Sequence, residues 1–223
     1  MSDIAARLKE IRETLPDHVR LVAVSKTRSV AEILEAWQAG QKVFGENKAQ
    51  ELTAKAPLLP QDIEWHFIGH LQRNKVRSIM PYVHMIHSID SHRLLKEVAG
   101  EAERAGRRIK CLLQFYIASE ETKFGLSEDE AAEICRDREL IHHPAVCIAG
   151  VMGMASLTDD QQVIHKEFAT LRTIFRNLKE VYYSDNPEFT EISMGMSDDY
   201  PVAIAEGSSL IRLGTAVFGS RNP

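Results

Sequence analysis

The feature of this 223-residue sequence that most restricts its fold is a regular alternation of short apolar runs and amphipathic helical segments. The runs have the length and β-branched content of buried strands, and helical periodicity follows them. Eight strands are expected, at residues 21–25, 43–44, 65–68, 85–89, 109–117, 146–151, 190–193 and 210–213. Helices are expected at residues 4–14, 30–37, 46–55, 73–80, 91–102, 127–134, 160–180 and 198–206.

A helix after every strand except the last forces neighbouring strands to pair in parallel. Eight such units in a chain of this length predict a closed (β/α)₈ TIM barrel of the α/β class. We expect a single domain over residues 1–223, with an extra N-terminal helix. A doubly wound open sheet is the alternative. In a barrel, functional residues lie at the carboxyl ends of the strands, and phosphates bind near the last two strands.

Composition excludes several classes of partner. Lys and Arg number 27 against 32 Asp and Glu, a net charge of −5, and a mildly acidic chain disfavours nucleic acid and anionic membranes. Cys111, Cys135 and Cys147 form no C-x-x-C pair, which is typical of a reducing compartment. The charged N-terminus is unlike a secretory signal, and no run is long enough to span a membrane. We therefore expect a cytoplasmic protein, and a monomer because no apolar stripe is left for a dimer interface.

Lys26 ends the first expected strand, in the segment AVSKT at residues 23–27. Desolvation of an ammonium group is costly, and burial lowers its pKa and produces the nucleophilic amine that Schiff-base chemistry requires. The alternative is a lysine whose stem covers the barrel rim while its amine reaches solvent.

The last two strands run into glycine–hydroxyl turns, SMGMSDD at 193–199 and RLGT at 212–215. Glycines admit an anion close to the backbone, and Ser197, Thr215 and nearby N–H groups would complete a phosphate site. Ser197 is alternatively a helix cap. Arg212 inside the last strand needs a partner, either a core carboxylate or a ligand atom such as a pyridine nitrogen. Asn47 either bonds a ligand or caps a helix.

Several segments together carry a family resemblance that covers essentially the whole chain. They are LVAVSKT (21–27), FGEN (44–47), WHFIGHLQRNK (65–75), KFG (123–125), GVMGMA (150–155), SMGMSDD (193–199) and IRLGTAVFG (211–219). The sequence resembles the YggS/PROSC family of pyridoxal 5′-phosphate (PLP) homeostasis proteins. The resemblance implies the barrel of the alanine racemase N-terminal domain, the fold type III of PLP proteins.

The resemblance also implies roles for single residues. Lys26 would hold PLP as an internal aldimine, a Schiff base, and Arg212 would face the pyridine nitrogen. Asn47 would lie beside the ring. Lys123 is either a second amine near the cofactor or a charge on the rim. The implied phosphate and wall residues are Ser197, Gly214 and Thr215 for the phosphate, with Met194 and Met196 in the wall.

One segment departs from the family pattern. Family members commonly carry Val-Asn near the end of the fifth strand, whereas this chain has Gln114-Phe115-Tyr116. A polar contact made by that asparagine is either replaced by the Tyr116 hydroxyl or lost.

Three functions are compatible with these residues. The first is intracellular storage, buffering or delivery of PLP, with PLP-dependent apoenzymes and amino or keto acids as partners. An Arg that faces the pyridine nitrogen favours this function, because it weakens PLP as an electron sink. The sequence also ends at Pro223, so we expect no C-terminal domain such as the one that supplies the second base in alanine racemase. The second is a low-turnover PLP-dependent racemase. Its second base would be one of His66, His70, Tyr116 or Lys123. The third is a cofactor-free Schiff-base aldolase or sugar-phosphate isomerase.

Overall fold

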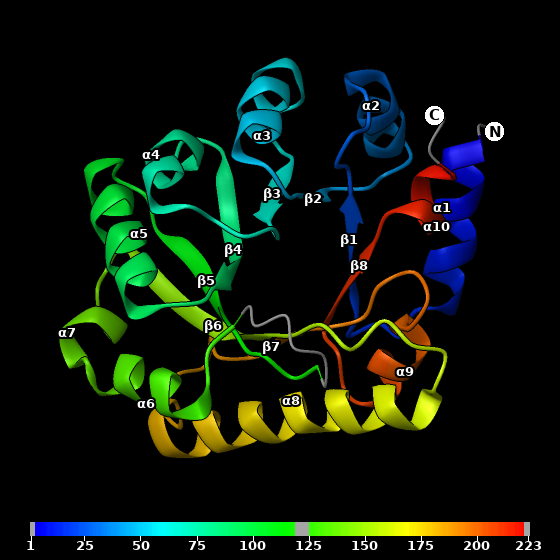
Figure 1. Cartoon of the computed structure of the whole chain (residues 1–223). Coiled ribbons are helices and arrows are strands. Elements are labelled where there is room, and N and C mark those ends of the chain that lie inside the picture. Colours follow the sequence, from blue (N-terminus) through cyan, green and yellow to red (C-terminus); the bar gives the residue numbers. More distant parts are fainter. Residues whose placement is uncertain (1–2, 119–124, 221–223) are drawn as a thin grey trace.

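The computed structural model describes residues 3–118 and 125–220, and these form one closed barrel of eight parallel strands (Figure 1). The strands follow one another around the barrel in sequence order, and β8 pairs with β1 to close it. The open-sheet alternative is therefore wrong. The strands are β1 (Arg20–Val24), β2 (Val43–Glu46), β3 (Glu64–Phe67), β4 (Val83–Ile89), β5 (Ile109–Gln114), β6 (Val146–Met152), β7 (Glu191–Ser193) and β8 (Leu210–Leu213).

Helices surround the barrel on the outside, as the alternation predicts. The first helix lies beside the last one, so the first and last described elements of the chain lie on one side of the barrel (Figure 1). The α-helices are α1 (Asp3–Thr14), α2 (Val30–Gln38), α3 (Ala49–Lys55), α4 (Val76–Ile79), α5 (His92–Arg104), α6 (Glu128–Arg136), α7 (Arg138–Ile141), α8 (Gln161–Tyr182), α9 (Tyr200–Ala205) and α10 (Thr215–Phe218), with 3₁₀ turns η1 (Ala56–Leu58) and η2 (Arg73–Lys75).

The helix starts follow local capping chemistry. Ser29 and Ser127 each accept a hydrogen bond from the third residue of the helix that follows, whose Glu side chain bonds back to the backbone of the serine. Ser91 and Asp160 cap α5 and α8 through their side-chain oxygens. Such caps satisfy N–H groups that have no partner within the helix. The predicted starts of these helices are confirmed to within one residue.

The structure differs from several of the expected elements. Glu46 is the last residue of β2 and is fully buried, whereas the helix that we expected to begin there begins at Ala49. The fifth strand ends at Gln114, three residues before the expected Ile117, because β6 ends opposite it at Met152 and leaves no further ladder partner. A short helix, α10, follows β8, although none was expected.

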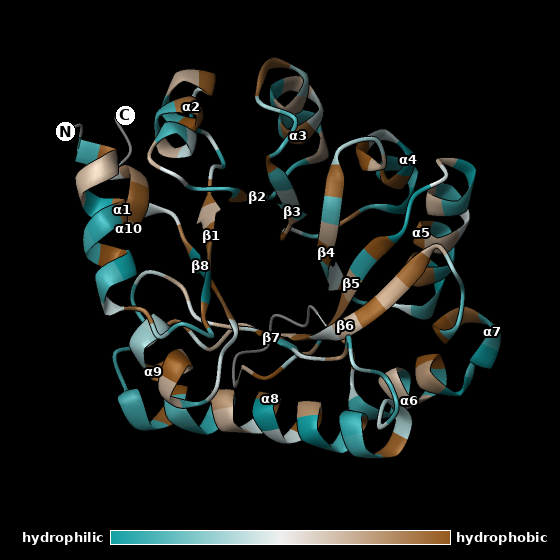
Figure 2. Cartoon of the chain, turned by 180° about the vertical axis from the view of Figure 1, so that it is seen from behind, coloured by the Kyte–Doolittle hydropathy of each residue, from teal (hydrophilic) through white to brown (hydrophobic). Residues whose placement is uncertain are grey.

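Two apolar layers hold the barrel together. The outward-facing strand residues pack against the helices, and a smaller cluster fills the barrel itself: Val22, Met85, Leu112, Cys147, Ala149, Met152 and Leu210. Figure 2 shows β5 and β6 as largely hydrophobic, whereas α8 alternates along its length between hydrophobic and hydrophilic residues. Strand alternation therefore decides which side chains enter the barrel and which face the helices.

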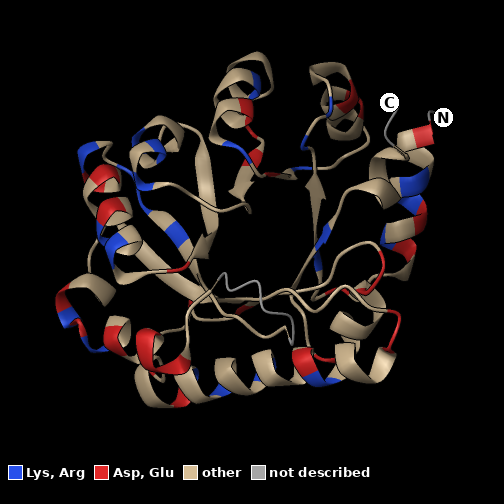
Figure 3. Cartoon of the chain, viewed as in Figure 1, with Lys and Arg blue, Asp and Glu red and all other residues tan. Residues whose placement is uncertain are grey.

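The outer surface carries charges of both signs. Basic and acidic residues are interspersed on the helices, for example on α1, α5 and α8 (Figure 3). No helix among the described residues is long and apolar enough to cross a membrane.

Candidate functional site

A pocket of about 270 Å³ opens at the carboxyl ends of the strands. Most of its lining comes from the loops that follow β1, β2, β6, β7 and β8, as a barrel requires of a functional site. The described residues that line it are Val24, Lys26, Arg28, Asn47, Ile68, Met154, Met196, Ser197, Asp198, Arg212, Gly214 and Thr215.

The pocket brings together nearly all the residues that the sequence singled out. Six of the seven proposed cofactor-binding residues line it, namely Lys26, Asn47, Ser197, Arg212, Gly214 and Thr215. Met196 lines it as well, with 38% of its surface exposed. Residues from the first and last strands thus converge on one site.

Met194 is the exception, because it is not among the described residues that line the pocket. The side chain is fully buried in the outer core, between the sheet and the helices. Side chains alternate along β7 and its extension, so that Ser193 enters the barrel and Met194 faces away from it.

Five of the described lining residues were missed by the sequence analysis, namely Val24, Arg28, Ile68, Met154 and Asp198. Arg28 and Asp198 lie within two residues of a predicted site residue in the same strand-end loop, and Met154 lies in the loop after β6. The placement of these loops at the carboxyl ends of strands was a usable signal for these three residues. The directions of these side chains could not be predicted from the sequence.

The pocket is positively charged within an acidic protein. Its described lining contains three cationic side chains, Lys26, Arg28 and Arg212, against the one carboxylate of Asp198. Arg28 is partly neutralised by Glu32 at 3.2 Å, and it donates to the carbonyl of Gly219. A local positive field of this kind attracts small anionic ligands.

Arg212 forms the buried end of the pocket, with only 4% of its surface exposed. Nη1 donates to the Ser193 hydroxyl at 2.6 Å, and Nη2 donates to the carbonyl of Gly153 at 3.1 Å. Burial lowers the pKa of Arg212 to about 10, and nearby Asp199 opposes this effect. An arginine has five N–H donors, so these two bonds leave others for a ligand. Within the described protein, the partners of Arg212 are therefore a hydroxyl and a carbonyl, and the core carboxylate considered as its partner is not directly bonded to it.

Two buried histidines extend this hydrogen-bonded chain through the barrel. His87 Nδ1 lies 2.9 Å from the Ser193 hydroxyl, and His87 Nε2 lies 2.9 Å from Nδ1 of His66. Because the Ser193 oxygen accepts a hydrogen bond from Arg212, we assign the Ser193 hydroxyl as the donor to His87 Nδ1. The His87 ring then carries its proton on Nε2 and donates it to His66 Nδ1. Burial lowers the pKa of His66 to about 3 and lowers that of His87 well below its usual value. Both rings are therefore neutral at pH 7.

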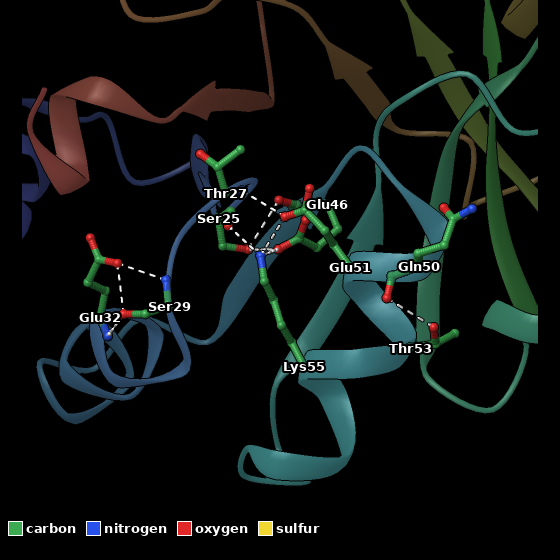
Figure 4. Close-up of polar contacts among 10 residues, drawn as sticks. Ser25, Thr27, Ser29, Glu32, Glu46, Gln50, Glu51, Thr53 and Lys55 are labelled. Carbon is green, nitrogen blue, oxygen red and sulfur yellow. Dashed lines mark hydrogen bonds and ion pairs between the residues drawn. The ribbon is translucent and has the colours of Figure 1, made fainter. Parts of the chain in front are cut away.

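Lys26 is half-buried and lies in a tight turn after β1. The next residue, Thr27, has a φ of +64°, which is the only positive φ of a non-glycine residue in the described parts of the chain. For a β-branched residue this conformation stores about 1–3 kcal/mol of strain. Figure 4 shows the side chains around this turn, which come from β2 and α3. Backbone strain beside a pocket lysine indicates a functional position.

Asn47 follows β2, and its Oδ1 atom is buried without a hydrogen-bond partner among the described residues. It does not cap α3, whose preceding residue is Lys48. An unpaired buried acceptor that lines a pocket is suited to receive a hydrogen bond from a ligand. The alternative role of Asn47 as a helix cap is therefore wrong.

Ser197 and Thr215 line the pocket where the chain leaves the last two strands. The cap of α9 is Asp199, whose carboxylate bonds the Met196 N–H, so the alternative role of Ser197 as a cap is wrong. Gly195 has a φ of +95°, and a Cβ there would lie 2.6 Å from Ala203 Cβ. This turn therefore requires glycine for packing as well as for its backbone conformation.

Of the candidate second bases, the three that the structure describes do not line this pocket. His66 lies deeper in the barrel, His70 is bonded to Asp90 at 3.1 Å, and Tyr116 does not line the pocket. Lys123 lies outside the described residues.

Fold and site together define a class: a barrel of the alanine racemase N-terminal type with a lysine after its first strand. The model of the family "Alanine racemase, N-terminal domain" matches residues 1–222. An alanine racemase of Clostridium difficile superposes with a TM-score of 0.76 at 12% identity, covering 99% of this chain and 57% of that one, which shows the fold alone.

Closer relatives specify the family. A pyridoxal phosphate homeostasis protein of Synechocystis is 37% identical over 95% of this chain and 96% of its own length, and one of Haemophilus influenzae is 35% identical over 92% and 86%. The structure of PipY from Synechococcus elongatus without PLP has a TM-score of 0.91 at 38% identity and covers 97% of this chain and 100% of PipY. PipY with PLP bound has a TM-score of 0.87. The chain belongs to the family of pyridoxal phosphate homeostasis proteins.

Proposed function

We propose that this protein binds PLP and serves PLP homeostasis by storing, buffering or delivering the cofactor. The observation that carries the proposal is the convergence of Lys26, Arg212 and Thr215 on one positively charged pocket. The name of the relatives and the PLP-bound structure of PipY support the same ligand.

The residues of the pocket fit this cofactor chemically. Lys26 supplies an amine for a Schiff base with the aldehyde, and Arg212 lines the pocket and has N–H donors beyond the two that bond Ser193 and Gly153. The Asn47 oxygen has no partner among the described residues. Ser197, Gly214 and Thr215 line the pocket on the loops of the last two strands, where barrels of this kind bind phosphate.

The arrangement favours a carrier over a racemase. Racemisation needs a base on each face of the substrate, and none of the described candidates for a second base, His66, His70 and Tyr116, lines the pocket, which offers only the Asp198 carboxylate beside Lys26 among its described residues. An arginine donating to the ring nitrogen also keeps that nitrogen unprotonated, which weakens the electron-sink chemistry that PLP supplies when bound. Low-turnover racemisation is retained as the alternative.

Location and assembly complete the proposal. Cys111, Cys135 and Cys147 are free and buried, which suits a reducing cytoplasm. Few large apolar residues are exposed among those that the structure describes, and two of them, Met154 and Met196, line the pocket, as expected of a monomer whose partners, PLP-dependent apoenzymes and amino or keto acids, bind transiently. Size-exclusion chromatography with light scattering tests the monomer.

The decisive experiment is an absorption spectrum of the purified protein with PLP, before and after borohydride reduction, followed by peptide mass mapping. We expect the reduced adduct on the peptide that contains Lys26, and its loss in Lys26→Ala with an unchanged circular dichroism spectrum. Lys166→Ala, an exposed lysine of α8, is the matched control and should retain the adduct. A wild-type protein that binds no PLP would overturn the proposal and favour a cofactor-free barrel enzyme.

A second measurement separates carrier from enzyme. PLP-loaded protein is mixed with a PLP-dependent apoenzyme whose activity reports transfer, and a panel of L-amino acids is assayed for racemisation. We expect transfer without sustained turnover. Sustained racemisation that Lys26→Ala abolishes would instead establish the racemase.

A further inference from the structure

The turn that carries Lys26 cannot be explained by its own sequence. The N–H of Arg28 bonds the carbonyl of Ser25 at 3.0 Å, so residues 25–28 form a β-turn with Lys26 and Thr27 at its two central positions. A turn with positive φ only at its third residue favours Gly or Asn there, whereas this chain has Thr27 with a φ of +64°. Contacts from outside the turn must therefore hold it.

One ion pair of α3 bonds both peptide groups that flank Lys26. Glu51 Oε2 accepts the Thr27 N–H at 2.7 Å, which holds the peptide after Lys26. Lys55 Nζ donates to the Ser25 carbonyl at 2.9 Å, which holds the peptide before it. Glu51 and Lys55 are themselves 2.8 Å apart, one helical turn from each other (Figure 4). The direction of the Lys26 Cα–Cβ bond is thus set from both sides.

The ion pair is anchored in turn by Glu46 of β2. Lys55 Nζ donates to Glu46 Oε1 at 2.8 Å, and Ser25 Oγ donates to the same oxygen at 2.7 Å. An ammonium group has three N–H donors, and Ser25, Glu46 and Glu51 use all three. Lys55 therefore cannot swing away without losing a buried hydrogen bond.

Burial and charge support a permanent contact. The Glu51 and Lys55 side chains are 22% and 12% exposed, and Glu46 is fully buried. Burial alone would raise the pKa of Glu51, but the hydrogen bonds from Lys55 and the Thr27 N–H hold that pKa below its usual value. The carboxylate is therefore ionised throughout the neutral range.

We infer that Glu51 and Lys55 are positioning residues that aim the Lys26 amine into the pocket and thereby set how readily it bonds covalently to PLP. The inference rests on the proposed function, and neither residue lines the pocket itself. It predicts that loss of Glu51 or Lys55 weakens the covalent attachment of PLP to Lys26 and leaves the binding of the ring and phosphate unchanged.

The test compares two ligands that share the ring and phosphate. PLP carries the aldehyde that reacts with Lys26, whereas pyridoxamine 5′-phosphate carries an amine and forms no such bond. We expect Glu51→Ala to weaken PLP binding by about tenfold and to lower the fraction trapped by borohydride on Lys26, while pyridoxamine 5′-phosphate binds within about twofold of wild type. Glu10→Ala, an exposed glutamate of α1, is the matched control and should change neither affinity.

Two further variants link the effect to the turn. Glu51→Gln keeps an oxygen acceptor for the Thr27 N–H, so it should lose less PLP affinity than Glu51→Ala. Thr27→Gly makes the turn favourable without external support, so Glu51→Ala should cost clearly less PLP affinity in that background. This partial rescue is an outcome that a general loss of folding would not produce.

Three results would overturn the inference. The first is an equal loss of affinity for both ligands in Glu51→Ala, which would show a pocket-wide structural role. The second is unchanged trapping on Lys26. The third is a loss of PLP affinity in Glu51→Ala that is as large in the Thr27→Gly background as in the otherwise wild-type chain. If Glu51→Ala does not fold, Glu51→Gln replaces it in each comparison. A wild-type protein that binds neither ligand would overturn the proposed function instead.

Discussion

Arg212 donates a 2.6 Å hydrogen bond to the hydroxyl of Ser193, and both side chains are buried. The two residues lie on adjacent strands, β8 and β7. This contact holds the guanidinium at the end of the pocket and links it to the two buried histidines. The position of the cation is therefore part of the barrel's internal packing.

We expect Ser193→Ala to lower the free energy of unfolding by about 2–3 kcal/mol, because it leaves a buried cationic donor without its acceptor. Urea unfolding followed by circular dichroism measures the change. Ser78→Ala, an exposed serine that bonds only the carbonyl of Lys75, is the control and should stay within about 0.5 kcal/mol. A similar small change in both variants would contradict the structural importance of the Arg212 contact.

We expect acid to destabilise the fold through His66 and His87. Burial lowers the pKa of His66 from 6.5 to about 3 and that of His87 well below 6.5. Below pH 6.5 the unfolded chain therefore binds protons that the folded protein does not. As the pH drops below about 6.5, the free energy of unfolding should fall by up to about 1.4 kcal/mol per pH unit for each ring that stays neutral in the folded protein.

Urea unfolding at pH 7, 6 and 5 measures this slope. The double variant His66→Gln/His87→Gln should show a clearly flatter dependence than wild type, because its amides do not titrate. His18→Gln, at an exposed position, should keep the wild-type slope. Parallel slopes for wild type and the double variant would show that the histidines are not the cause.

We expect Thr215→Ala to weaken PLP binding by about 1–2 kcal/mol, or about 5- to 30-fold, because it removes one hydrogen bond to a charged group. Equilibrium titration followed by absorbance measures the dissociation constant. Thr173→Ala, whose hydroxyl bonds only the Ala169 carbonyl within α8, is the control. An unchanged dissociation constant in Thr215→Ala would remove this residue from the proposed phosphate site.

The two neighbouring methionines should behave differently. Met194 is fully buried in the outer core, so Met194→Ala should cost about 2–5 kcal/mol of stability. Met196 lines the pocket and is partly exposed, so Met196→Ala should cost little stability and weaken PLP binding by about threefold. Thermal unfolding and PLP titration of both variants make the comparison. Equal loss of stability in the two variants would contradict this assignment.

Local patterns were sufficient for the order of elements. The alternation of apolar runs and amphipathic helices predicted the closed barrel, and serine and aspartate caps marked several helix starts. The ends of the strands were less predictable. Gln114 ends β5 because its neighbour β6 ends there, and that depends on register between segments far apart in sequence.

For the site, the strand-end positions of Lys26, Asn47, Ser197 and Thr215 could be predicted. The role of Glu46 could not, because the residue faces α3 and contacts a lysine nine residues away. The conformation of Thr27 was equally hidden, since it contradicts the preference of its own residue type.

The sequence by itself determined that eight parallel strands place their carboxyl ends on one rim, which brings the first and last strands together around Lys26 and Arg212. It did so because strand and helix periods are local properties of the chain. Only the tertiary structure decided which of two adjacent residues enters the barrel, as with Ser193 and Met194, and which distant side chains hold the Lys26 turn. Those outcomes depend on register and packing, which no short segment contains.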